Sequence, residues 1–125
     1  MPLNIRFRTV GVWLCALLVA VVAQAADFGT KVAYQKDTPV QFGAFGLTFL
    51  GERRVASEKF PRGFLYYDFR VTSPHGTQTI SWSLGTGDIG PLPFKVGSDG
   101  FELELRLSDK LGRLKEGEMV VSRVP

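Results

Sequence analysis

The sequence has very little cysteine and histidine, the residues that bind zinc and copper and that act in catalytic triads. It contains one cysteine, Cys15, and one histidine, His75, in 125 residues. A zinc or copper centre is built from several such ligands, and a catalytic triad needs a histidine with partners at bonding distance. His75 stands in a Pro-His-Gly sequence, which is typical of an exposed turn. We therefore expect no metal site, no cofactor and no triad chemistry.

No apolar run is long enough to cross a membrane. The longest covers residues 10–22, whereas a spanning helix needs about 20 apolar residues. Arg6 and Arg8 precede this run and Ala-Gln-Ala follows it at residues 23–25, which is the pattern of a secretory signal peptide. We expect cleavage after Ala25 and export to the bacterial periplasm or the medium. An uncleaved anchor is the alternative.

Cleavage would leave residues 26–125 as a single β domain with no membrane anchor. This domain has no cysteine, so apolar burial must stabilise it without disulfides. Two of the 15 basic residues leave with the signal and all 12 acidic residues stay, so the net charge becomes 13 − 12 = +1. A nucleic-acid-binding domain normally carries a strong positive excess. The charge therefore argues against a nucleic-acid partner.

Apolar and polar residues alternate in two runs on either side of residues 73–76, a turn-forming Ser-Pro-His-Gly. This arrangement predicts a β-hairpin at the centre of the fold. Trp82 is the only tryptophan left after cleavage, and we expect it in the core facing Phe69 or Leu103. The residues expected to face inward are Leu65, Tyr67, Phe69, Val71, Ile80, Trp82 and Leu84.

Alternation elsewhere predicts further strands. Residues 50–52 disturb its phase as a β-bulge would; without the bulge, Arg53 would point inward. Residues 94–96 and 101–107 predict a second hairpin. In its second strand, Phe101, Leu103, Leu105 and Leu107 are expected to face the core, and Glu102, Glu104 and Arg106 to face water.

The C-terminal part is less regular. Ser108 is a candidate cap for a single helical turn within residues 108–114. Residues 118–124 predict a last strand. Its inner face is either the one that carries Met119 and Val121 or the one that carries Val120 and Val124. In all, about six to eight short strands joined by Gly/Pro turns favour an all-β, small antiparallel β-sandwich, with a small β-barrel as the alternative.

Residues 85–90, Gly-Thr-Gly-Asp-Ile-Gly, match the dinucleotide-binding fingerprint. That motif works because a helix N-terminus follows it and holds the pyrophosphate. Here Pro-Leu-Pro follows at residues 91–93, which does not start such a helix. We interpret the segment as a long turn and expect no dinucleotide binding.

Two aspartates keep an enzymatic alternative open. Asp68 has aromatic neighbours and would have a raised pKa if buried, and Asp88 lies in the glycine-rich turn. Two carboxylates within about 10 Å across a cleft would suit a small hydrolase. The sequence does not say whether Asp68 and Asp88 approach each other.

Basic and aromatic residues cluster between residues 52 and 66. Arginine forms bidentate bonds with acidic groups, and an exposed aromatic ring supplies apolar contact area. The alternatives are a solvated loop with local ion pairs and a strand face covered by another segment. The candidate binding residues are Arg53, Arg54, Lys59, Phe60, Arg62, Phe64 and Tyr66.

These features favour a small exported, non-catalytic binding or inhibitory module. Its partner would be an envelope or extracellular protein with an acidic surface. The alternatives are the carboxylate-dependent hydrolase and a structural or assembly factor of the cell envelope.

Overall fold

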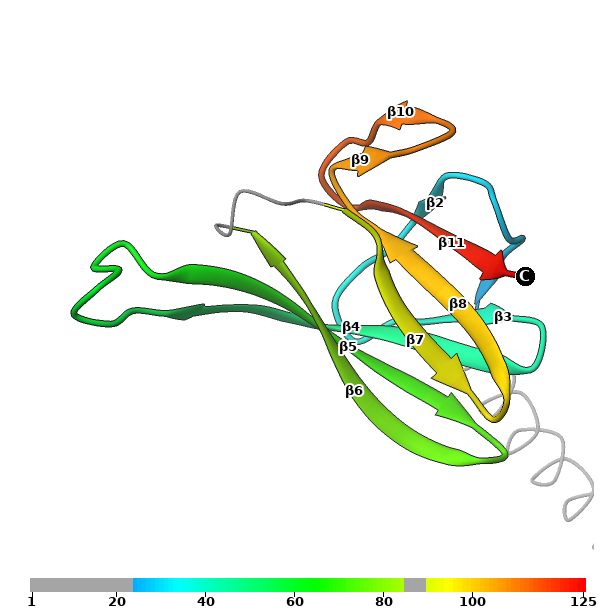
Figure 1. Ribbon diagram of the computed structural model, residues 1–125. Helices are drawn as coiled ribbons and strands as arrows, with labels where there is room; N and C mark the ends of the chain where they lie inside the picture. Colours follow the sequence, from blue (N-terminus) through cyan, green and yellow to red (C-terminus); the bar gives the residue numbers. More distant parts are fainter. Residues whose placement is uncertain (1–23, 85–89) are drawn as a thin grey trace, which may run out of the picture.

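Two β-sheets pack around a shared apolar core in the computed structural model, which describes residues 24–84 and 90–125 (Figure 1). The larger sheet has the strand order β1-β3-β4-β5-β6 and the smaller has the order β2-β11-β8-β7. Within the described residues no sheet closes into a barrel, so the predicted all-β sandwich is confirmed. The strands are β1 (Gln24–Ala25), β2 (Val32–Ala33), β3 (Pro39–Phe42), β4 (Phe45–Val55), β5 (Phe64–Ser73), β6 (Gly76–Leu84), β7 (Leu92–Val96), β8 (Asp99–Glu104), β9 (Leu107–Ser108), β10 (Gly112–Arg113) and β11 (Glu118–Val124).

The central hairpin, β5 with β6, follows the predicted pattern. The two strands pair without interruption from Leu65 with Leu84 to Ser73 with Gly76, so the turn is shorter than expected and consists of Pro74 and His75. The inward residues of this hairpin include some of the most deeply buried of the described chain. Those classed as buried are Tyr67, Phe69, Val71 and Trp82.

The predicted β-bulge is confirmed in β4. The register between β4 and β5 shifts between Phe49 and Gly51, and Gly51 has a φ of 124°, which other residues rarely adopt. The extra residue places Arg53 on the outer face, with its side chain half exposed, instead of beside the core. β4 and β5, with 11 and 10 residues, are longer than the short strands expected.

The alternation predicted for residues 101–107 holds as far as Leu105 and breaks after it. Glu104 points away from the core, as expected, but the β9–β10 turn covers it and it is only 5% exposed, whereas Leu107 is 45% exposed; the exposure expected for each of these two side chains is therefore wrong. The chain leaves the sheet after Glu104, and Arg106 takes a φ of 71°. This left-handed residue changes the phase of the side chains that follow it.

The helical turn expected in residues 108–114 is also wrong. β9 and β10 form a small antiparallel hairpin there, in which Gly112 has a φ of 76°. Ser108 does accept a hydrogen bond from the backbone N–H of Leu111 at 3.2 Å, as a cap would. The same side-chain geometry closes a tight turn, because Ser favours caps and turns alike.

The last strand has both of its faces covered. Met119 and Val121 belong to the main core, while Val120 is buried on the opposite side, where it lines a pocket together with Ser108 and Leu111. The sequence pattern was ambiguous because two layers cover this strand, the other sheet and the β9–β10 turn.

The N-terminal part of the described chain joins both sheets. β1 pairs in parallel with β3, and β2 pairs with β11. Tyr34 packs edge-on against Phe49 and Phe69, and its burial raises the pKa of its hydroxyl to about 12. No helix long and apolar enough to cross a membrane is present in the described ranges.

Candidate functional site

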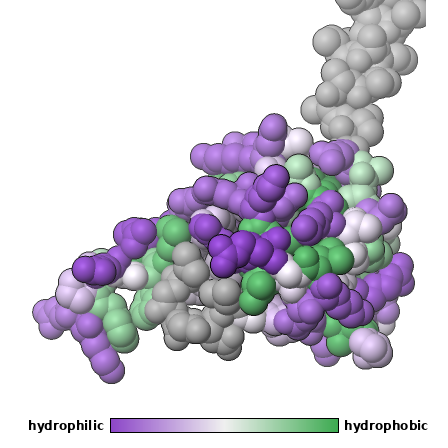
Figure 2. Space-filling model, turned by 90° about the horizontal axis from the view of Figure 1, so that it is seen from above, coloured by the Kyte–Doolittle hydropathy of each residue, from purple (hydrophilic) through white to green (hydrophobic). Residues whose placement is uncertain are grey.

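β4 and β5 project from the body of the molecule as a hairpin, which β6 flanks as far as Leu65 (Figure 1). We call residues 52–66 the arm: it comprises the end of β4, the connecting loop of residues 56–63 and the start of β5. Pairing persists to its far end, where Val55 lies opposite Phe64. Figure 2 shows the arm as a narrow projection on which hydrophilic and hydrophobic side chains lie side by side.

The loop at the tip of the arm has a defined conformation. The backbone N–H of Phe60 donates to Ser57 Oγ at 3.2 Å, and the N–H of Gly63 donates to the carbonyl of Phe60 at 2.9 Å. Gly63 has a φ of 74°, and a Cβ at this position would lie 2.5 Å from the Val55 carbonyl oxygen. The tip therefore requires glycine there.

Apolar and cationic groups share the surface of the tip. Phe60 is 44% exposed, and its ring centroid lies 4.9 Å from that of Phe64. The Lys59 ammonium lies 5.7 Å from the centre of the Phe60 ring. Arg54 donates to the carbonyl of Arg62 at 2.7 Å, while the Arg62 guanidinium has no partner within the described part of the chain. An exposed aromatic ring surrounded by cations is thus available for contact.

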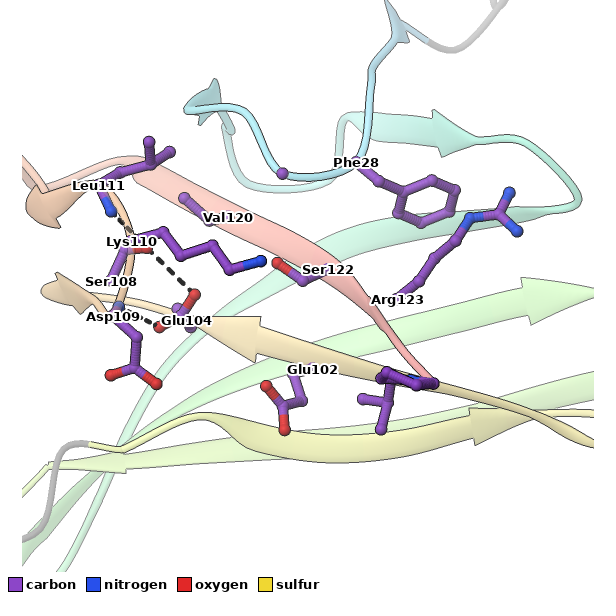
Figure 3. A pocket seen from close by; sticks show the side chains of 13 residues that line it. Phe28, Glu102, Glu104, Ser108, Asp109, Lys110, Leu111, Val120, Ser122 and Arg123 are labelled. Carbon is purple, nitrogen blue, oxygen red and sulfur yellow. Dashed lines mark hydrogen bonds between the residues drawn. The ribbon is translucent and has the colours of Figure 1, made fainter.

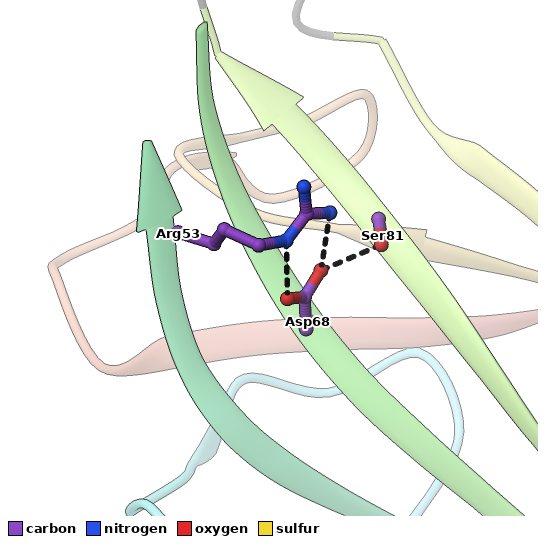
Figure 4. Close-up of polar contacts among 3 residues, drawn as sticks. All are labelled: Arg53, Asp68 and Ser81. Atoms are coloured by element: carbon purple, nitrogen blue, oxygen red, sulfur yellow. Dashed lines mark hydrogen bonds and ion pairs between the residues drawn. The ribbon is translucent and has the colours of Figure 1, made fainter. Parts of the chain in front are cut away.

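A polar cluster stands at the base of the arm (Figure 4). Arg53 donates to both carboxylate oxygens of Asp68, at 3.0 and 3.2 Å, and Ser81 Oγ donates to Asp68 Oδ1 at 2.6 Å. The Arg53 guanidinium also lies over the Tyr66 ring, 4.6 Å from its centre. The cluster therefore links β4, β5 and β6 on the outer face of the sheet.

These hydrogen bonds determine what Asp68 can do chemically. The Arg53 guanidinium lowers the pKa of the Asp68 carboxyl and Ser81 lowers it further, while partial burial opposes both. The same hydrogen bond raises the pKa of Arg53. Asp68 is only partly buried, so the raised pKa expected for a buried Asp68 does not apply, and an ionised, fully engaged carboxylate does not suit a general acid. Asp88 lies outside the described residues.

We expect Asp68→Asn to remove part of the acid sensitivity of the fold. The folded pKa of Asp68 is below its unfolded value, so the interaction stabilises the fold above pH about 4 and is lost as the pH falls through the folded pKa. Half of the Arg53 side chain is exposed, so the effect at neutral pH should be at most about 1 kcal/mol. Urea unfolding from pH 7 to pH 2 measures it. Glu58→Gln, an exposed arm carboxylate without an ion pair, is the control, and equal acid profiles for the wild type and Asp68→Asn would contradict the expectation.

A concave region lies on the outer face of the smaller sheet (Figure 3). It has a volume of about 380 Å³ and lies against β8, β11 and the β9–β10 turn. Buried Glu104 accepts hydrogen bonds from Ser108 Oγ at 3.1 Å and from the Asp109 N–H at 2.8 Å. The alternating pattern of β8 concealed this residue, since it predicted an exposed side chain. Both Glu104 oxygens hold the turn, so we assign Glu104 a structural role.

The other motifs of the sequence lie apart from the arm. His75 is exposed in the β5–β6 turn, where its ring packs against Gly97. Most of the glycine-rich motif, residues 85–89, lies outside the described residues; the next described element is strand β7, which begins at Leu92. Among residues 24–84 and 90–125 no cluster of His, Cys, Asp or Glu is arranged to hold a metal ion.

The structure brings the predicted binding residues together in two groups on one projection. Arg53 and Tyr66 lie at the base of the arm, and Lys59, Phe60 and Phe64 lie at its tip. We take the arm as the candidate site for three reasons. It projects from the molecule, it exposes both apolar and cationic side chains, and its own hydrogen bonds fix the conformation of its loop. Comparison of the chain with protein-family models, with curated proteins and with solved structures gives no match.

Proposed function

We propose that the protein is exported and acts as a non-catalytic binding or inhibitory module whose arm contacts an acidic surface of an envelope or extracellular protein. The signal-peptide pattern of residues 6–25 supports export to the periplasm or the medium. The observation that carries the binding role is the exposed Phe60, which lies among cations on a projecting hairpin.

The shape of the arm suits insertion into a concave surface. Beyond Leu65, where β6 ends, the tip projects from the sheet, and its loop is ordered by internal hydrogen bonds. A preorganised tip loses less conformational entropy on binding than a flexible loop does. Phe60 would supply the buried anchor, as aromatic residues commonly do at interfaces.

The charges favour an acidic partner. Residues 52–66 contain four basic and two acidic side chains, although the expected mature chain has a net charge of only +1. Arg53 is engaged by Asp68, which leaves Arg54, Lys59 and Arg62 to face a partner. Exposed charges of this kind steer association and are screened by salt.

Capture experiments with a photo-crosslinker in place of Phe60 test this proposal. The same crosslinker in place of His75, on an exposed turn away from the arm, is the positional control. We expect a specific adduct from the arm only, and its yield should fall as salt is added. An intact mass that begins at Ala26 would establish the expected processing.

Two sets of substitutions distinguish binding through the arm from a general effect of the protein's positive charge. Changing Arg54, Lys59 and Arg62 to serine should abolish most capture and leave the melting temperature nearly unchanged, because surface changes usually fall within about ±0.5 kcal/mol each. Changing Lys110, Arg113 and Lys115 to serine removes the same charge from another exposed surface. Phe60→Ala should weaken binding about tenfold or more, as truncation of an anchor costs on the order of 2 kcal/mol. Equal capture by all the variants would place recognition elsewhere.

The alternatives have less support. A carboxylate hydrolase would use Asp68, which is held ionised by Arg53 and Ser81. A structural or assembly factor of the envelope fits the fold equally well, and a large adduct that contains several different envelope components would favour it.

A further inference from the structure

The edge strands of the two sheets differ in how they are protected from pairing with another chain. A free edge offers unpaired N–H and C=O groups, and natural proteins usually shield it with short strands, proline or lysine. β1 and β2 are edges of only two residues. The edge strand β7 contains Pro93 and Lys95. These three described edges are therefore protected.

β6 is the exception. Figure 1 shows it as the outermost strand of the larger sheet. Its nine residues, Gly-Thr-Gln-Thr-Ile-Ser-Trp-Ser-Leu, include no charged residue and no proline, and its pairing with β5 runs without a bulge. A long, regular and uncharged edge is the form that accepts another strand most readily.

The geometry of the hairpin identifies the free backbone groups. The two-residue turn closes with Ser73 opposite Gly76, a pair that exchanges backbone hydrogen bonds. Alternate residues of β6 then direct their backbone groups away from β5. These residues are Thr77, Thr79, Ser81 and Ser83, and no backbone hydrogen bond outside the sheet engages them in the described residues.

We propose that β6 pairs with β6 of a second copy of the chain in antiparallel orientation, which joins two five-stranded sheets into one. A twofold axis at Ile80, the midpoint of the strand, would overlap all nine residues of both copies. It places Thr79 opposite Ser81 and Thr77 opposite Ser83, so only small, uncharged side chains lie opposite each other; within each copy Ser81 Oγ stays bonded to Asp68 and Ser83 Oγ is buried. No like charges within β6 oppose this self-pairing.

The occupant is a second copy, because β6, which is uncharged and has only Thr and Ser at the residues with outward backbone groups, meets no like charge and no bulky side chain there when it pairs with itself. This inference does not depend on the proposed function, since the arm extends from other strands. The dimer would carry two arms, which would increase the avidity for a multivalent partner without any new contact.

Sedimentation analysis over a range of concentrations tests the proposal on the protein as its host cell processes it. We expect a concentration-dependent dimer. Thr79→Pro removes one outward N–H and should weaken the dimer about tenfold or more. Thr77→Lys with Thr79→Lys should abolish it by repulsion. Thr72→Lys adds one positive charge to an exposed position of the interior strand β5 and should leave the dimer intact.

Amide hydrogen exchange locates the contact. The N–H groups of Thr77, Thr79, Ser81 and Ser83 should gain protection as the concentration rises, and the melting temperatures of the variants show whether each one folds. A protein that stays monomeric up to roughly 1 mM overturns the proposal. So does a dimer that persists in both β6 variants. A monomer in which these amides are protected only after a partner is added assigns the edge to that partner's strand and also overturns self-pairing.

Discussion

Trp82→Ala should lower the free energy of unfolding by about 3–5 kcal/mol, as truncation of a large buried aromatic residue does. Trp82 is 2% exposed, and its ring stands edge-on to Tyr67 on the neighbouring strand, with the ring centroids 5.6 Å apart. The substitution removes this contact and leaves a cavity between the two sheets. Because a small domain is stable by only about 5–15 kcal/mol, much of its stability would be lost.

Equilibrium urea denaturation measures this effect. Trp82→Phe keeps an aromatic ring at the site and should cost clearly less than Trp82→Ala. Phe60→Ala removes an exposed ring from the arm and should barely change the midpoint. If Trp82→Ala were as stable as the wild type, the indole would not be part of the core and would become a candidate binding residue.

Glu104→Ala should cost about 1–3 kcal/mol, which is the usual penalty when buried hydrogen-bond donors lose their acceptor. The Glu104 carboxylate receives the Ser108 hydroxyl and the Asp109 N–H, and the residue is almost fully buried. Without the carboxylate, both donors would have to form hydrogen bonds with water instead, and the chain between β8 and β9 would lose the contacts that fix its position. We therefore expect both a lower stability of the whole domain and faster local opening of the β9–β10 hairpin.

Thermal unfolding and amide exchange of the β9–β10 hairpin measure the two parts of this effect. Glu104→Gln keeps one oxygen acceptor and should recover part of the lost stability. Glu102→Ala, on the same face of β8 but less buried, is the matched control. A Glu104→Ala protein with unchanged exchange in residues 107–113 would show that the carboxylate does not hold this turn.

The sequence predictions are accurate where they depend on residues close together in the chain. The β5–β6 hairpin and the bulge before Arg53 depend on alternation and turn residues within a few positions of each other, and both are confirmed. The prediction for Leu107 failed because a single residue with a positive φ, Arg106, reverses the phase after Leu105, and the prediction for Glu104 failed because the β9–β10 turn covers the outer face of β8. Sequence alternation carries no mark of that reversal.

The candidate site was predicted only in part. The sequence located the cluster of basic and aromatic residues, but it described the segment as a loop, whereas half of it is a paired ribbon. The register of β4 against β5 brings Arg53 to Asp68, whereas Arg62, in the connecting loop, has no side-chain partner among the described residues. A residue's availability for a partner depends on contacts that cross strands.

By itself, the sequence determined the all-β class, the two main hairpins and the position of the basic cluster, because each of these depends on the side-chain period and on turn residues close together in the chain. Only the tertiary structure decided that β4 and β5 extend as an arm, that both faces of β11 are covered and that Asp68 is held ionised. Each of these depends on segments that meet through packing or strand register. Arg53 and Asp68, for example, are 15 residues apart in the chain and meet because the bulge turns Arg53 outward.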